Sequence, residues 1–201
     1  MPELVTAWPM LLFWVVAGYL LGSVPFGVVV SRAMGLGDLR KIGSGNIGTT
    51  NVLRTGSKTA ALATLLLDGG KGALAVVIAR FFAAEDAAQL AAAAAFAGHC
   101  FPVWLRGKGG KGVATYLGVM LALWWPAGLL ACATWVAVAL SMRISSLSAL
   151  VAAALGPVFL WLTGYPGAVL LALVLAAIIY WRHAANIARL MAGTEPRIGK
   201  R

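Results

Sequence analysis

Long apolar segments separated by short polar connections run through the whole chain. About 20 apolar residues are needed for a helix that crosses a membrane, and the pattern predicts seven such helices. They cover residues 4–31, 59–83, 86–105, 113–124, 126–142, 147–163 and 166–182. The stretch 113–142 is divided at "WWP" (124–126), because interfacial tryptophans and a proline are typical of a turn at the membrane surface. The sequence therefore predicts an all-α integral membrane protein, folded as one domain over residues 1–201.

The composition agrees with this class. Hydrophobic residues make up 61% of the chain and charged residues only 11%, which is far too apolar for a soluble domain of this length. Cys100 and Cys132 each lie inside an apolar run without C-x-x-C spacing. We therefore expect neither a disulfide framework nor a metal site built on them.

Basic residues set the expected orientation, because cytoplasmic connections are enriched in Lys and Arg. All 16 Lys and Arg except Lys71 and Arg80 lie after the first, third, fifth or seventh predicted helix. They are Arg32, Arg40, Lys41, Arg54, Lys58, Arg106, Lys108, Lys111, Arg143, Arg182, Arg189, Arg197, Lys200 and Arg201. This predicts seven transmembrane helices with the N-terminus outside and the C-terminus cytoplasmic. The net charge of +10 would then face the cytoplasm, where it attracts anionic headgroups or an anionic substrate.

The first polar connection, "KIGSGNIGTTN" (41–51), has the composition of a phosphate-binding loop. Its glycines allow the backbone N–H groups to point into one concavity, and such a nest binds anions. Hydroxyls and amides add further donors, and arginines flank the loop with charge. The candidate residues are Arg40, Gly43, Ser44, Gly45, Asn46, Thr50, Asn51 and Arg54.

Three further polar segments are expected on the same membrane face. "RGKGGKG" (106–112) repeats the glycine-rich pattern and offers Lys108, Gly109, Gly110 and Lys111 to a second phosphate. "RISSLS" (143–148) and "WRHAANIARLMAGTE" (181–195) follow the fifth and seventh predicted helices. We expect the four segments to converge on one side of the membrane.

Residue spacing argues against several other chemistries. Neither Lys71, Lys108 nor Lys111 is followed by Ser or Thr, so no Walker A nucleotide loop is present. The few carboxylates are scattered, which disfavours a bound metal, and no serine has a nucleophile-elbow context. We expect no cofactor, no metal and no nucleic-acid partner.

The chain resembles one family, the bacterial membrane acyltransferases that move a fatty acyl group from acyl phosphate to glycerol 3-phosphate. The matching blocks are "DLRKIGSGNIGTTNVLR" (38–54), "LDGGKG" (67–72), "GHCFPVWLRGKGGKGVAT" (98–115) and "RHAANIARLMAGTE" (182–195). The resemblance implies acylation of the sn-1 hydroxyl, giving 1-acyl-glycerol 3-phosphate (lysophosphatidic acid) and phosphate, the first acylation in phospholipid synthesis. It also implies a bacterial inner-membrane location, contact with membrane lipids, and an active site facing the cytoplasm.

The resemblance also assigns roles to residues. It implies that Gly43, Ser44, Gly45, Asn46 and Thr50 hold the acyl phosphate, and that Arg54, Lys111, His183 and Asn186 hold glycerol 3-phosphate. Ser146 matches the family's serine pair, whereas the second serine is displaced to Ser148. The expected reaction is direct attack of the glycerol hydroxyl on the acyl carbonyl, with Ser44 and Lys111 stabilising the developing charge. Either His183 or the substrate's own phosphate serves as the general base.

Two other functions would leave different marks in the sequence. A small-anion transporter would show related halves and several charges near the midplane. An acyltransferase using coenzyme A or carrier-protein thioesters would carry an H-x-x-x-x-D motif, which this chain lacks.

Asp68 and Lys71, spaced i, i+3 within an apolar helix, are expected to form a structural ion pair. His99 is expected to be a structural donor at a helix end.

Overall fold

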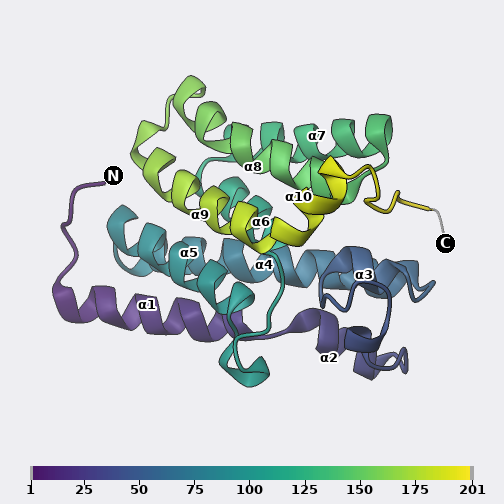
Figure 1. The fold of residues 1–201 in the computed structure, drawn as a ribbon. Coiled ribbons are helices and arrows are strands. Elements are labelled where there is room, and N and C mark those ends of the chain that lie inside the picture. Colours follow the sequence, from purple (N-terminus) through teal and green to yellow (C-terminus); the bar gives the residue numbers. More distant parts are fainter. Residues whose placement is uncertain (1, 200–201) are drawn as a thin grey trace.

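Helices account for all regular structure between residues 2 and 199, which the computed structural model describes, and no strand occurs among these residues. Lys200 and Arg201 of the basic tail lie outside the described residues. The α-helices are α1 (Trp8–Ser23), α2 (Phe26–Ala33), α3 (Thr49–Leu53), α4 (Lys58–Phe82), α5 (Glu85–Cys100), α6 (Val113–Leu123), α7 (Trp125–Met142), α8 (Ser145–Leu162), α9 (Val169–Arg182) and α10 (Ala184–Met191) (Figure 1). Three short 3-10 helices cover Leu39–Lys41 (η1), Val103–Leu105 (η2) and Pro166–Ala168 (η3).

The predicted all-helical membrane class is confirmed. Five helices among the described residues are long and apolar enough to cross a membrane, or six if the bent pair Pro166–Arg182 and Ala184–Met191 counts as one span. The apolar stretch 113–142 is broken at Trp124, which is extended at φ −153°, so the predicted division into two helices is correct.

The helix α6 is shorter than a membrane-crossing helix. Its 11 residues rise about 16 Å, roughly half the thickness of a bilayer's hydrocarbon core. Its C-terminal carbonyls are satisfied within the protein, because the Arg80 guanidinium donates to Ala122 O at 2.7 Å and to Leu123 O at 3.2 Å. These contacts tie the C-terminal end of α6 to the last turn of α4.

The first predicted span, residues 4–31, is interrupted in the structure. Pro25 has no N–H and restricts the residue before it, and the chain leaves helical geometry at Val24 (φ −63°, ψ 116°) before α2 begins. The apolar pattern continues across this break, so hydropathy alone does not reveal it.

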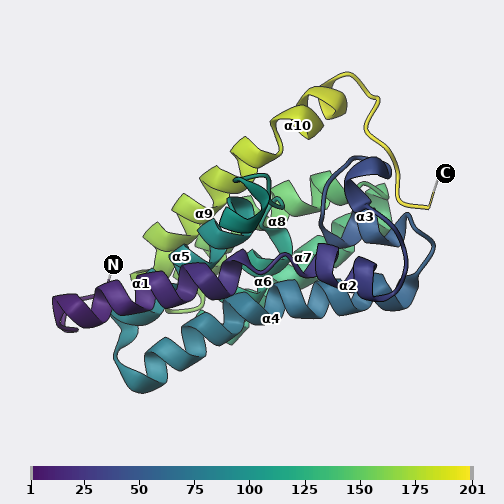
Figure 2. The same ribbon diagram turned by 90° about the horizontal axis from the view of Figure 1, so that it is seen from below.

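The helices α1 and α5 pack closely side by side, with α1 at the edge of the bundle (Figures 1 and 2). Gly18 and Gly22 lie directly against the backbone of Ala91 and Ala95, where any added Cβ would overlap a carbonyl oxygen. The spacing of small residues lets the two helices pack backbone to backbone, which is the usual way membrane helices associate.

The helices α2 and α3 and the C-terminal segment lie toward the end of the bundle away from the N-terminus (Figures 1 and 2). The C-terminal segment is tied to the α7–α8 connection, because Ile198 N donates to Arg143 O at 2.6 Å and Arg143 Nη2 donates to Ile198 O at 3.1 Å. The fold therefore brings polar connections from distant parts of the sequence together.

Candidate active site

The loop Gly43–Asn51 is held in shape by the side chain of Asn51. Its Oδ1 accepts from Ser44 N at 3.1 Å, and its Nδ2 donates to Leu39 O at 2.9 Å and to Asn46 O at 2.7 Å. Asn51 is 2% exposed, so these loop contacts use its polar atoms. Gly43 and Gly45 have φ of +53° and +69°, a region that other residues rarely adopt.

The outer side of this loop carries exposed polar groups. Gly43, Ser44 and Thr50 are exposed, and Arg54 lies beside the loop with Nη1 3.3 Å from Asn51 Oδ1. Asn46 instead turns inward, where its Oδ1 accepts from Gly48 N at 3.0 Å. The loop region thus presents the Ser44 and Thr50 hydroxyls and the Arg54 guanidinium to solvent, whereas the N–H groups of Ser44, Gly45 and Gly48 are used within the loop.

Arg40 differs from the expectation that it brackets the loop with free charge. Its guanidinium pairs with the Asp38 carboxylate at 2.8 Å on the protein surface. The hydrogen bonds from Arg40 hold the pKa of Asp38 at about 2. Arg40 is therefore neutralised locally, and among the described residues its guanidinium makes no hydrogen bond or ion pair with the other candidate residues.

The second glycine-rich loop does not form the expected nest of free N–H groups. Gly109 N donates to Cys100 O at 3.2 Å, and Gly110 N donates to His99 O at 3.1 Å. The carbonyls of Gly109 and Gly110 accept from Arg182 at 2.9 and 3.2 Å. Both backbone groups of these glycines are thus occupied, because the loop must dock against α5 and α9.

The lysines of this loop differ in environment. Lys108 is exposed and makes no side-chain hydrogen bond or ion pair with any residue between 2 and 199. Lys111 is partly buried and donates to Oδ1 of Asn186. The loop therefore contributes one positioned ammonium group rather than a backbone cradle.

Glu195 links the remaining polar segments. Its Oε1 accepts from Asn186 Nδ2 at 2.5 Å and from Ser146 Oγ at 2.6 Å, and its Oε2 lies 2.7 Å from Arg189 Nε. The chain from Lys111 through Asn186 to Glu195 is thus a continuous hydrogen-bonded network. These hydrogen bonds lower the pKa of Glu195 and keep it ionised.

The serines of α8 have separate roles. Ser145 Oγ lies 3.0 Å from Thr50 Oγ1, which joins the first loop to α8. Ser146 bonds to Glu195, whereas Ser148 Oγ donates to Ile144 O of its own helix at 2.9 Å and is fully buried. Ser148 is therefore turned away from the Glu195 network. Sequence reasoning named Ser148 but missed Ser145.

His183 lies at the bend between α9 and α10 and is 3% exposed. Its Nδ1 is 2.8 Å from Ile179 O, and a carbonyl can only accept, so Nδ1 carries the proton and Nε2 has the lone pair. Burial lowers the pKa of His183 to about 4. The imidazole is therefore neutral near pH 7 and offers Nε2 as a hydrogen-bond acceptor.

Positive charge is concentrated around Lys111. Burial lowers the pKa of Lys111 to about 8; Glu195 opposes this effect, and Arg189, Arg182 and Arg54 reinforce it. A cluster of four cations with one carboxylate carries excess positive charge that an anion would neutralise. We call these five residues the cation cluster.

Three of its members were missing from the candidate residues predicted from sequence, namely Arg182, Arg189 and Glu195. The positions 182, 186 and 189 have the spacing of one helical face, which would have pointed to both arginines. The structure brings the four polar segments together, because hydrogen bonds join residues 50 to 145, 111 to 186, 146 to 195 and 182 to 109.

Comparison with known proteins identifies the family. The family model for glycerol-3-phosphate acyltransferase matches residues 12–193. The chain is 67% identical over 201 residues to the glycerol-3-phosphate acyltransferase of Ruegeria sp. (strain TM1040), covering 100% of both chains. It is 61% identical to that of Ruegeria pomeroyi, covering 100% of this chain and 99% of the relative.

Two solved structures share the fold. Both are crystal structures of PlsY (YgiH), an integral membrane glycerol 3-phosphate acyltransferase. The glycerol 3-phosphate form has a TM-score of 0.88 at 38% identity, covering 94% of this chain and 96% of that one. The lysophosphatidic acid form has a TM-score of 0.87 at 37% identity, covering 94% and 95%. Family match, overall identity and shared fold agree, and this chain therefore belongs to the glycerol-3-phosphate acyltransferase family.

Proposed function

We propose that the enzyme transfers a fatty acyl group from acyl phosphate to the sn-1 hydroxyl of glycerol 3-phosphate, releasing 1-acyl-glycerol 3-phosphate and inorganic phosphate. The observation that carries this proposal is the cation cluster beside the exposed donors of the Gly43–Thr50 loop. Two neighbouring anion-binding regions fit two phosphate-bearing substrates. The PlsY forms with glycerol 3-phosphate and with lysophosphatidic acid support the acceptor and the product.

The two regions divide the substrates between them. Gly43, Ser44, Gly45 and Thr50 face the acyl phosphate, with Asn46 and Asn51 shaping their loop. Arg54, Lys111 and Asn186 face glycerol 3-phosphate, and His183 Nε2 accepts a hydrogen bond from it. The exposed Lys108 and the paired Arg40 contribute at most to attracting anions from a distance, and Ser146 acts through Glu195.

The chemistry needs no covalent enzyme intermediate. The glycerol oxygen attacks the acyl carbonyl, a new C–O bond forms, and the bond from the acyl carbon to the phosphate oxygen breaks. The phosphate leaves with its bonding electron pair, and the hydroxyl proton passes to a base. Lys111 and the Ser44 loop stabilise the negative charge that develops on the carbonyl and phosphate oxygens, and each such donor typically contributes about 2.7 to 4 kcal/mol.

The base is either His183 or a substrate phosphate, and the pKa values favour the phosphate. The pKa of His183 is lowered to about 4, which makes its Nε2 a weak base near pH 7. A phosphate monoester has a second pKa near 6 and is the stronger proton acceptor. The role of His183 is then to orient the acceptor through a hydrogen bond.

We also propose the topology expected from charge: one domain over residues 1–201 with seven crossings, N-terminus outside, and the active site facing the cytoplasm at the bacterial inner membrane. In this topology α6, although short, counts as one of the seven crossings, and Arg80 donates to its last carbonyls. Single cysteines introduced at Glu3 and at Arg197, in a variant lacking Cys100 and Cys132, test this topology. A membrane-impermeant thiol reagent applied to intact cells should label only the cysteine at position 3.

The reaction is tested with purified enzyme and three donors: acyl phosphate, acyl-coenzyme A and acyl carrier protein. With acyl phosphate and glycerol 3-phosphate we expect one equivalent of inorganic phosphate for each molecule of 1-acyl product. Turnover only with a thioester donor would refute the proposal. Product analysis with enantiomerically pure acceptor establishes which hydroxyl is acylated.

A further inference from the structure

A buried ionic cluster lies inside the bundle, apart from the groups that the proposed reaction uses. Asp68 and Lys71 of α4 are each 2% exposed, and Lys71 Nζ lies 2.8 Å from Asp68 Oδ1. This confirms the pairing expected from sequence. His99 Nδ1 of α5 lies 3.5 Å from the same carboxylate oxygen. Burying such charges is costly, so their contacts merit a functional explanation.

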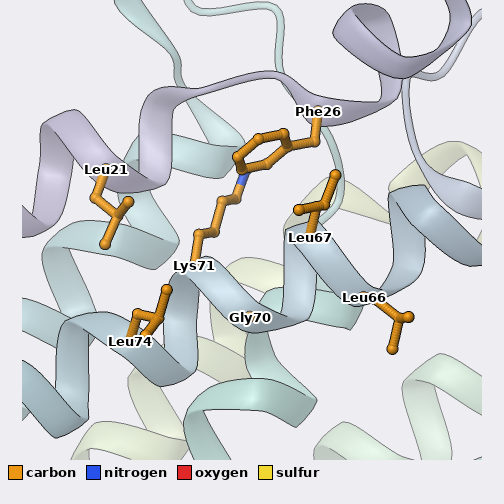
Figure 3. A pocket seen from close by; sticks show the side chains of 7 residues that line it. All are labelled: Leu21, Phe26, Leu66, Leu67, Gly70, Lys71 and Leu74. Carbon is orange, nitrogen blue, oxygen red and sulfur yellow. The ribbon is translucent and has the colours of Figure 1, made fainter.

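Lys71 reaches the break between α1 and α2. Its Nζ donates to Val24 O at 2.8 Å and lies 5.6 Å from the centre of the Phe26 ring. Figure 3 shows the Lys71 side chain extending from α4 toward Phe26, inside an apolar groove of about 100 Å³ that Leu21, Leu67 and Leu74 help to line. Val24 O also accepts from Phe26 N at 3.1 Å, so the ammonium group adds a second donor to a carbonyl at the break between α1 and α2.

The helix that follows this break supports the first substrate loop. Gly27 of α2 lies against the backbone of Ile47, so closely that a Cβ at this position would overlap Ile47 O. Ile47 belongs to the loop that presents Ser44 and Thr50. Lys71 thus bonds to the residue pair that leads into α2, and α2 in turn packs against this loop.

Asp68 and His99 support the second loop. His99 O accepts from Gly110 N at 3.1 Å, and a Cβ at Gly110 would overlap the His99 imidazole. The backbone carbonyl of Asp68 accepts from Thr115 Oγ1 at 2.9 Å at the start of α6. The segment that carries Lys111 is thus held on both sides: at Gly110 by the His99 carbonyl and imidazole, and at Thr115 by the backbone carbonyl of Asp68.

We propose that Asp68, Lys71 and His99 are positioning residues that fix the two substrate loops relative to each other. Lys71 acts on the Ser44 loop through Val24 and Gly27. His99 acts on Lys111 through Gly110. Because a displacement of about 1 Å between reacting groups can lower a rate by about 100-fold, a rigid support common to both loops is directly useful for a reaction of two bound substrates. The division of substrates between the loops rests on the proposed function.

Three variants test these two connections separately. Lys71→Met is expected to raise KM for acyl phosphate more than KM for glycerol 3-phosphate. His99→Gln is expected to raise KM for glycerol 3-phosphate and to lower kcat. The double variant Asp68→Asn/Lys71→Met removes both charges together, which keeps the site free of an unpaired buried charge, and should lose at least about tenfold in kcat/KM while its thermal midpoint stays near that of wild type.

The matched control is Glu85→Gln, which breaks the ion pair with Arg80 (2.8 Å) at the far end of α4 and should leave both KM values unchanged. A purely structural role for the cluster would change the yield or the thermal midpoint and leave kcat and KM of the folded enzyme at wild-type values. That result in the double variant and in His99→Gln overturns the proposal.

A second measurement does not depend on which acyl donor the enzyme uses. The pH midpoint for reductive methylation of Lys111, followed by mass spectrometry, should lie near the pKa of about 8 in wild type and move upward in His99→Gln, because a released loop rehydrates the ammonium group. If acyl phosphate is not a substrate but this midpoint shifts, only the proposed function fails. If acyl phosphate is turned over and neither the midpoint nor the kinetic constants change, the positioning role fails.

Discussion

Lys111 donates a hydrogen bond to Oδ1 of Asn186 across 75 positions of sequence. This contact joins the glycine-rich loop before α6 to the helix that follows the bend at His183. An ammonium group has three N–H donors, so one orients Lys111 and the others remain for a ligand. The contact therefore positions a charge and leaves it available for binding.

Removal of the Lys111 charge should be the most damaging single change in the site. In Lys111→Met we expect kcat to fall about 100- to 1,000-fold, the usual effect of deleting one donor to a developing oxyanion. Steady-state phosphate release measures it. Lys58→Met is the control, because Lys58 is exposed at the first residue of α4 and its loss should change kcat less than about twofold. Equal effects of the two substitutions would contradict the assigned role.

The direction of the hydrogen bonds at Asn186 can be tested by exchanging charge. Asn186 Nδ2 lies 2.5 Å from Glu195 Oε1. Asn186→Asp would place a second carboxylate at this position, and like charges so close together repel. We expect at least about a tenfold loss in kcat/KM. Addition of Glu195→Gln restores a donor opposite the new carboxylate and should recover part of the activity. A double variant as poor as the sum of the two single variants would show that the network does not work as a unit.

The pH dependence of kcat/KM follows from the lowered pKa of Lys111 and from the effect of Glu195 on that pKa. Lys111 is cationic below its pKa of about 8, so kcat/KM should fall about tenfold per pH unit above that value. A bound phosphate favours the charged form, and the basic limb of kcat should therefore lie at higher pH. Glu195 raises the pKa of Lys111, so Glu195→Gln should move the limb to lower pH. A flat profile up to pH 10 would contradict this assignment.

A substitution at His183 separates the two candidate bases. Because the pKa of His183 is lowered to about 4, we expect His183→Gln to retain activity within about tenfold of wild type, with an unchanged profile between pH 5 and 7. Any acid limb near pH 6 then belongs to the substrate phosphate. A loss of about 100-fold or more, together with the disappearance of that limb, would instead identify His183 as the base.

Alanine substitutions at Gly35 and Gly43 separate the effect of backbone strain from the effect of displacing Arg54. Gly35 and Gly43 have φ of +68° and +53°, and alanine in this region costs about 1 to 2 kcal/mol. At Gly43 a Cβ would lie 2.7 Å from both Arg54 Cδ and Asn51 Oδ1, whereas at Gly35 it would meet nothing within 4 Å. Both alanine variants should lower the thermal midpoint, but only Gly43→Ala should raise KM for glycerol 3-phosphate. An equal rise in KM would exclude the Arg54 explanation.

Sequence alone determined the features that are encoded locally. The length and apolarity of each segment specify membrane helices, because a helix satisfies its own backbone in lipid. The "WWP" turn at Trp124 was therefore visible in the sequence. Glycine-rich polar connections in an apolar chain also marked Lys111 and the Ser44 loop, and the family resemblance added Asn186.

The tertiary structure decided which of these groups point into the site. Gly109 and Gly110 use their N–H groups on α5, Ser148 bonds to its own helix, and Arg40 is paired on the surface. Glu195 was scarcely distinguishable in the sequence, yet it connects Ser146, Asn186 and Arg189. These outcomes depend on contacts between residues far apart in the chain, and hydropathy and spacing carry information only about neighbours along it.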